Sequence, residues 1–106
     1  MPVNDVLRGN VQYSMILNVT LSPTSVANAT AAEQTFTVQG LAVGDFVNVT
    51  KPTTQAGLGI VNSRVSAANT LAITFMNTTA ATITPTASEV YVVAVDRPYT
   101  NPPSSF

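Results

Sequence analysis

Apolar and polar residues alternate with a period of two through most of the chain between Val11 and Arg97. The alternating segments are rich in Val, Ile, Thr and Phe, and residues typical of turns separate them. This period is that of β-strands with one buried face, and signals for helices are almost absent. The expected strands cover residues 11–21, 33–40, 46–50, 59–67, 69–77 and 89–97, with a short further segment at 81–84.

Strands of about five to ten residues, with turn signals about every 8–12 residues, are typical of a β-sandwich or barrel. Two longer connections, at residues 22–32 and 51–57, suit crossovers from one sheet to the other. The sequence therefore predicts an all-β fold: a small antiparallel β-sandwich, Greek-key or jelly-roll-like, with six to eight strands and extended termini. The segment 89–97 is almost continuously apolar, which predicts a central strand that is buried on both faces.

The chain divides into three parts by composition. Residues 11–97 form the predicted sandwich, and 106 residues leave room for only this one domain. Residues 1–10 have no clear period and are expected to form an extended N-terminal arm. Residues 98–106 are rich in proline, which predicts an extended C-terminal tail that does not pair in a sheet.

Few residues are charged, and this sets the expected partners. Asp, Glu, Lys and Arg make up 8% of the chain, against about 25% in most soluble domains. A surface built from Thr, Asn, Ser and Gln is poorly protected against association, so we expect much of it to contact other protein. Binding to nucleic acid or to a membrane is not expected, because the four basic residues are scattered along the sequence at Arg8, Lys51, Arg64 and Arg97.

Targeting and redox signals are sparse. The sequence contains no run of about 18 apolar residues, so no transmembrane helix is expected. The N-terminus does not have the basic and then apolar layout of a signal peptide. The lack of cysteine excludes disulfides and thiolate metal sites, and it fits synthesis in a reducing cytosol.

The residues needed for catalysis are also sparse. The chain has no His and no Cys, which are the commonest bases, nucleophiles and metal ligands. Asp45 follows Gly44 in a turn, where its carboxylate is expected to bond to its own backbone. The carboxylates are spread along the chain at Asp5, Glu33, Asp45, Glu89 and Asp96. We therefore expect no enzyme activity, no catalytic residue, no cofactor and no metal site.

The sequence AGLGI at residues 56–60 resembles a phosphate-binding loop only superficially. Such a loop needs a further Gly or a Gly-Lys-Ser/Thr and then a helix, whereas a predicted strand follows Gly59. Gly57 and Gly59 are instead expected to mark positive φ angles or a close approach of backbone. Residues 59–77 then form a β-hairpin with Leu71, Ile73 and Phe75 in the core. Its outward side chains, which a partner can touch, are those of Asn62, Arg64 and Thr74.

Six residues are candidates for contact with other protein. Apolar residues on extended termini can dock on a neighbouring molecule, although frayed termini are the alternative. Arg64 is either a solvated charge on an edge strand or part of an intersubunit salt bridge, and Lys51 is expected to be a solvated loop charge. The candidates are Val3, Val6 and Leu7 in the arm, Arg64 in the sandwich, and Tyr99 and Phe106 in the tail.

A set of motifs between Gly40 and Val95 resembles a family of small β-rich structural proteins encoded by tailed bacteriophages and prophages. The motifs are, in order, Val-Gly-Asp at 43–45, Lys-Pro at 51–52, Gly-Leu-Gly-Ile at 57–60, RVSAANTLAITF at 64–75 and ITPTA at 83–87. The similarity covers about half of the chain, and residues 1–39 match no motif of the family.

This resemblance implies a virion component without enzyme activity. The expected role is that of a capsid cement (decoration) protein, made in the host bacterial cytoplasm, that stabilises the shell of the major capsid protein at the capsid surface. Such proteins commonly form homotrimers. The alternative is a head-fibre, tail-fibre or baseplate module that binds a host-surface glycan or another virion protein. Glycan binding is disfavoured because the chain has no Trp, and because Tyr13 and Tyr91 fall within predicted strands.

Overall fold

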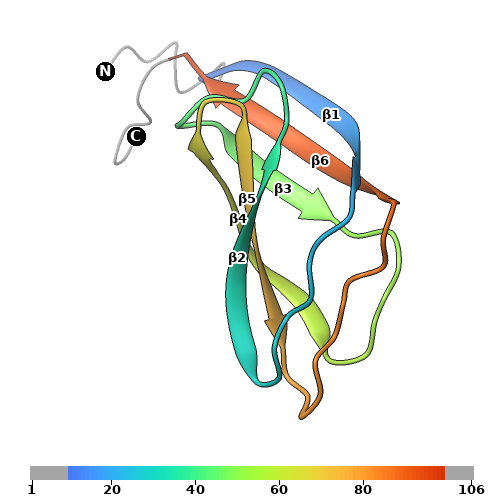
Figure 1. The fold of residues 1–106 in the computed structure, drawn as a ribbon. Coiled ribbons are helices and arrows are strands. Elements are labelled where there is room, and N and C mark those ends of the chain that lie inside the picture. The colour runs from blue at the N-terminus through green and yellow to red at the C-terminus, as the bar shows by residue number, and fades with distance from the viewer. Residues whose placement is uncertain (1–9, 100–106) are drawn as a thin grey trace.

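The computed structural model describes residues 10–99, which form two three-stranded antiparallel sheets packed face to face (Figure 1). The first sheet has the order β1-β6-β3 and the second the order β2-β5-β4. The strands are β1 (Val11–Leu21), β2 (Thr30–Thr37), β3 (Phe46–Thr50), β4 (Leu58–Ala67), β5 (Thr70–Asn77) and β6 (Glu89–Pro98). The predicted all-β sandwich is confirmed. Residues 10–99 contain no helix, and hence none that could cross a membrane.

Five of the expected strands agree with the structure to within a residue, and two segments differ. β2 lies three residues earlier than expected, because the chain turns at Val38 to bond its N–H to the carbonyl of Asn69. The segment 81–84 forms no strand. It makes a single antiparallel bridge, in which Val26 and Ile83 exchange backbone hydrogen bonds of 2.7 and 3.0 Å. This bridge joins two loops that are distant in sequence.

Every connection except the β4–β5 hairpin passes from one sheet to the other. The crossovers expected near residues 22–32 and 51–57 are therefore confirmed. The first of them carries Val26, which is completely buried although it lies outside the strands. These repeated crossovers connect the two sheets, which enclose one core.

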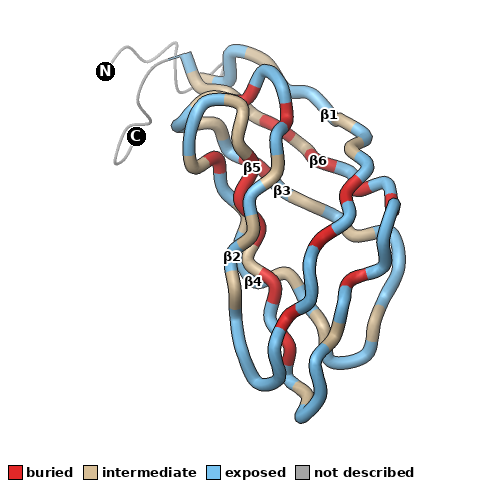
Figure 2. The backbone as a smooth tube through the Cα atoms, in the orientation of Figure 1, coloured by how far each residue is buried: buried red, intermediate tan, exposed pale blue. Residues whose placement is uncertain are grey.

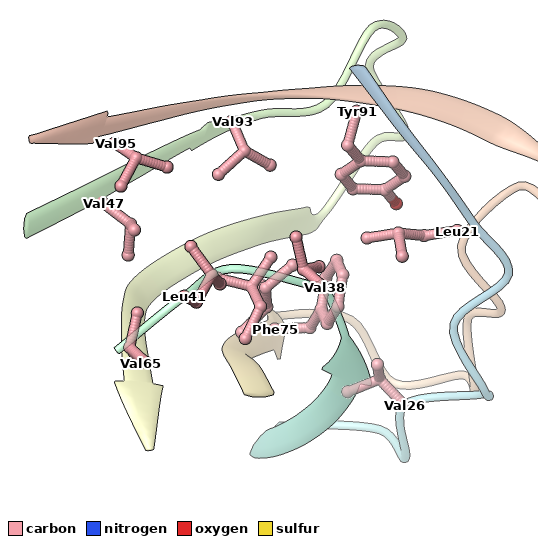
Figure 3. Packing of buried hydrophobic residues seen from close by; sticks show 12 residues of the cluster. Leu21, Val26, Val38, Leu41, Val47, Val65, Phe75, Tyr91, Val93 and Val95 are labelled. Carbon is pink, nitrogen blue, oxygen red and sulfur yellow. The ribbon is translucent and has the colours of Figure 1, made fainter. Parts of the chain in front are cut away.

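The core lies between the inward faces of the two sheets (Figure 3). Val93 and Val95 of β6 point across it toward Phe75 of β5 and Val65 of β4. Leu71, Ile73 and Phe75 are fully buried, so the prediction for the hairpin's inward face is confirmed. The buried cluster consists of Leu21, Val26, Val38, Leu41, Val47, Val65, Leu71, Ile73, Phe75, Tyr91, Val93 and Val95.

One polar side chain, that of Asn77 at the end of β5, is also fully buried. Its Nδ2 donates to the carbonyl oxygens of Val26 at 3.1 Å and Ala81 at 2.7 Å. Its Oδ1 accepts from the backbone N–H of Thr79 at 2.9 Å and from the Thr79 hydroxyl at 2.7 Å. The amide is thus fully satisfied, and it holds the crossover after β5 against the crossover before β2.

β6 lies between β1 and β3, which confirms its predicted central position. Its predicted burial on both faces is wrong for the single chain. Burial alternates along the strand (Figure 2), and Val90 and Val92 on the outward side are 45% and 38% exposed. The reason is that no other element in residues 10–99 covers this side of the sheet.

The sandwich ends close to its expected boundary. β6 continues to Pro98, and the N–H of Tyr99 donates to the carbonyl of Asn10 at 2.8 Å. The two ends of the described chain therefore lie side by side. The rest of the predicted arm and tail, including Val3, Val6, Leu7 and Phe106, lies outside the described residues.

Candidate interaction face

The outward side of the β1–β6–β3 sheet is the candidate functional surface, and we call it the outer face. Its residues alternate with core residues such as Leu17, Val47 and Val93, so they point away from the second sheet. The outer face consists of Ser14, Ile16, Asn18 and Thr20 of β1, Val90, Val92, Ala94 and Asp96 of β6, and Phe46, Asn48 and Thr50 of β3.

Large apolar side chains stand exposed on this face. Ile16 is 73% exposed, Phe46, which lies opposite Asp96, is 62% exposed, and Val90 and Val92 are exposed further along β6. In register across the three strands, Ile16 lies opposite Ala94, and Ala94 lies opposite Asn48. Asp96, near one end, is the face's one ionisable group. Apolar and neutral polar side chains together can be buried against a partner without desolvating a charge in the centre.

The outward side of the β2–β5–β4 sheet has a different character. There Arg64 of β4 reaches across β5 to Glu33 of β2 in a two-point ion pair, with Nε–Oε2 of 2.8 Å and Nη2–Oε1 of 2.9 Å. The pair spans the sheet above Ala72, which is fully buried. Val61, next to a register shift in β4, and Met76 are also exposed on this sheet. A charged pair open to water is typical of a solvated surface.

The two expectations for Arg64 are thereby partly corrected. Arg64 does lie on an edge strand, but its ion-pair partner is in its own chain rather than in a second subunit. The hydrogen bonds from Arg64 lower the pKa of the Glu33 carboxyl, and those to Glu33 raise the pKa of Arg64. The guanidinium is therefore already engaged, which weakens its candidacy as a contact residue.

A second ion pair holds the loop before β3. Arg97 of β6 donates from Nε to Asp45 Oδ1 at 2.7 Å, and from Nη2 to Asp45 Oδ2 at 2.8 Å and to the carbonyl of Gly40 at 2.8 Å. Its guanidinium also lies over the ring of Tyr13, 4.8 Å from the centroid. Asp45 accepts the N–H of Ala42 at 3.0 Å, so its predicted bond to its own turn is confirmed. The bond from Arg97 is the main cause that lowers the pKa of Asp45.

A third pair corrects the expectation that Lys51 is a solvated loop charge. Its Nζ lies 2.9 Å from Oε1 of Glu89, and both side chains are almost buried, at 11% and 9% exposure. The hydroxyl of Thr53 donates to Oε2 of Glu89, and this bond, followed by that with Lys51, lowers the pKa of Glu89. The pair ties the crossover after β3 to the start of β6, which is a structural role.

The structure offers little for chemistry in residues 10–99. No group of three or more carboxylates gathers there in a way that could hold a metal ion. The three acidic residues of the ion pairs are each neutralised by a basic partner and brace the fold.

The sequence-predicted contact residues are scattered over the molecule. Asn62 and Thr74 lie with Arg64 on the side opposite the outer face, and Tyr99 is 68% exposed at the end of β6. Ile16 and Phe46 are not among the contact residues predicted from the sequence. The signal was present in part, because Ile16 is a large apolar residue in the polar phase of its strand.

Comparison with known proteins adds no relative: no protein-family model, no curated protein and no solved structure matches the chain.

Proposed function

We propose that the chain is a non-enzymatic structural protein of a tailed-phage virion, a capsid cement (decoration) protein that binds the shell of the major capsid protein. The observation that carries the proposal is the contrast between the two sides of the sandwich. The outer face has exposed Ile16, Phe46, Val90 and Val92 around an uncharged centre, whereas the opposite side carries the Glu33–Arg64 ion pair. The resemblance of the motifs between Gly40 and Val95 to those of phage structural proteins supports the virion context.

The physical character of the outer face fits assembly into a shell. Its Asn, Thr and Ser side chains can hydrogen-bond to a partner with less desolvation cost than ion pairs require. A shell repeats each contact over many symmetric copies, so a modest apolar face is sufficient for stable decoration. A closed homotrimer at a three-fold position would also protect the edge strands β1 and β3 from open-ended pairing.

A fibre or baseplate module that binds glycans is the second candidate, and aromatic placement disfavours it. Sugar-binding sandwiches stack the sugar on exposed aromatic rings. Here Tyr91 is buried, and Tyr13 lies under the guanidinium of Arg97. Tyr99 is the one exposed tyrosine in residues 10–99, and it stands at the end of β6 rather than on a platform.

The proposal is tested by adding the purified protein to expanded capsids of the encoding phage that were assembled without it. We expect saturable binding with a fixed copy number for each three-fold site, measured by sedimentation and electron microscopy. The decorated shell should resist heat better than the bare shell. Binding to a glycan array together with no affinity for the capsid would refute the proposal.

Two matched variants test the surface used. Ile16→Asp places a charge on an edge strand of the outer face, and Asn62→Asp places one on an edge strand of the opposite side. Burying an unpaired carboxylate is costly, so Ile16→Asp should weaken capsid binding at least about a hundredfold. Asn62→Asp should bind as the wild type does. The opposite ranking would assign capsid binding to the other side of the sandwich.

A further inference from the structure

A hollow of about 380 Å³ lies at one end of the outer face, where all three strands of the sheet contribute to its wall. It is lined by Asn10, by Val11 of β1, by Asp96 and Pro98 of β6 and by Phe46 of β3. Val11 is 49% exposed and Phe46 is 62% exposed. Gly44 and Asp45 complete the lining, which is therefore mostly apolar with two carboxylates, Asp96 and Asp45, of which Asp45 is paired to Arg97.

The charges of the chain indicate what fits this hollow. In residues 10–99, each basic side chain already pairs with a carboxylate, in Lys51–Glu89, Arg64–Glu33 and Arg97–Asp45. Asp96 is the remaining carboxylate of the described part, and none of these three pairs uses it. The one other basic residue in the sequence is Arg8, two positions before Asn10.

Residues 1–9, which include Arg8, are also attached to the sandwich next to this hollow. Asn10 itself lines the hollow, and residues 1–9 are joined to the sandwich through it. Nine residues reach up to about 30 Å when extended, which is ample to cross three strands spaced about 4.8 Å apart. Gly9 permits a sharp turn of the backbone. A tether this short also gives the segment an effective concentration in about the millimolar range.

We propose that residues 1–9 dock in this hollow of their own chain, with Arg8 paired to Asp96 and with Val6 and Leu7 covering Phe46. Docking removes the most exposed aromatic side chain of the outer face from water and neutralises the one carboxylate on that face. A partner would then meet a surface composed of the outer face and this segment. The proposal goes beyond the capsid-binding role and does not depend on it.

Limited digestion with trypsin tests the docking, because the sequence leaves few accessible sites. Trypsin does not cleave before proline, which excludes Lys51-Pro52 and Arg97-Pro98. Arg64 lies within β4 and its neighbour Val65 is buried. Cleavage at Arg8-Gly9 therefore reports on the segment alone, and its rate follows the fraction of chains in which the segment is undocked.

Four variants give the expected pattern. Asp96→Asn should raise the cleavage rate about two- to fivefold, as expected for loss of a surface ion pair. Phe46→Ser should raise it about tenfold, because the apolar contact is lost. The matched controls, Glu33→Gln on the opposite side and Ile16→Ser on the outer face away from the hollow, should leave the rate unchanged. Thermal unfolding of each variant checks that the sandwich itself is intact.

Two results would overturn the proposal. The first is a wild-type cleavage rate equal to that of both Asp96→Asn and Phe46→Ser. The second comes from adding an excess of Arg8→Gln protein, which offers a hollow but has no cleavage site at position 8. If this excess slows cleavage of the wild type, the segment docks on a second copy rather than on its own chain. An unchanged rate supports docking within the chain.

Discussion

Arg97 and Asp45, which are 52 residues apart in the sequence, form a two-point ion pair that fastens the end of β6 to the turn before β3. The side chain of Asp45 is only 2% exposed. Because Asp45 also accepts the N–H of Ala42, one carboxylate shapes a turn and joins that turn to the central strand. Such a carboxylate works only while it is ionised, which links the fold to pH.

We predict that the protein loses stability in acid. The pKa values of Glu33, Asp45 and Glu89 are all lowered in the folded state. A lowered folded-state pKa contributes stability that is present above the unfolded-state value, near pH 4, and is lost as pH falls through the folded-state value. Urea unfolding should give a free energy that is level above about pH 5 and falls below about pH 4.

Asp45→Asn tests how much Asp45 alone contributes to the loss of stability in acid. The variant should be less stable than the wild type at pH 7, and its free energy of unfolding should fall less on acidification. A wild-type free energy that stays constant down to about pH 2 would contradict the linkage.

The two glycines of the AGLGI segment are predicted to respond oppositely to alanine. Gly57 has a φ of +80°, and a Cβ there would overlap the methyl group of Thr79. Gly59 has no neighbour within 4 Å of an added Cβ. Gly57→Ala should lower the free energy of unfolding by about 2 kcal/mol or more. Gly59→Ala should leave it unchanged or raise it by up to about 1 kcal/mol.

Urea titration of both variants measures the difference, and a third variant locates its cause. Thr79→Ser removes the overlapping methyl group and keeps the hydroxyl that bonds to Asn77. In the Thr79→Ser background, Gly57→Ala should cost less than in the wild type. Equal costs in both backgrounds would assign the whole effect to the positive φ.

Asn77 is predicted to be the most sensitive polar residue of the fold. Asn77→Ala leaves the buried carbonyl groups of Val26 and Ala81 without this donor, so the free energy of unfolding should fall by about 2–4 kcal/mol. The control is Asn62→Ala on the exposed side of the neighbouring strand, which should change it by less than about 0.5 kcal/mol. Similar losses in the two variants would show that the buried network contributes little.

Tyr91 gives a prediction at alkaline pH. Its ring is buried in the core (Figure 3), and its hydroxyl has no hydrogen-bond partner among the described residues. Burial raises its pKa to about 12, with a smaller effect from the charge of Glu89. The unfolded chain ionises near pH 10, so stability is full below about pH 10 and declines as pH rises toward 12.

Tyr91→Phe removes both the unpaired hydroxyl and the ionisable group at this position. The variant should be at least as stable as the wild type at pH 7, because an unpaired buried hydroxyl costs about 1–3 kcal/mol. It should also lose less stability between pH 10 and 12, as followed by circular dichroism in urea at each pH. A marked loss of stability at pH 7 would show that the hydroxyl is hydrogen-bonded in solution.

The alternation of side chains predicted much of the fold. β1 and β3 have the bounds that the period indicated, and the hairpin of β4 and β5 buries Leu71, Ile73 and Phe75 as expected. A strand's period depends only on neighbouring positions, so it can be read locally. The same reasoning failed for residues 81–84, because a short apolar segment does not reveal that its partner, Val26, offers only one bridge.

The local sequence pattern also predicted that β6 is apolar, but it did not indicate which part of the structure would cover the strand. Val90 and Val92 were expected to be buried, and in the single chain they are exposed. The sequence by itself determined that both sides of this strand are apolar. Only the arrangement of the sheets decided that one side faces the core while the other remains available to a partner.

The ion pairs belong wholly to the tertiary structure. Arg64 with Glu33, Lys51 with Glu89, and Arg97 with Asp45 join residues 31, 38 and 52 positions apart, and no spacing in the sequence connects them. Composition determined that charges would be few, whereas the crossovers between sheets decided which of them meet. A side chain's charge is a property of its residue, but its partner depends on where distant segments of the chain are brought together.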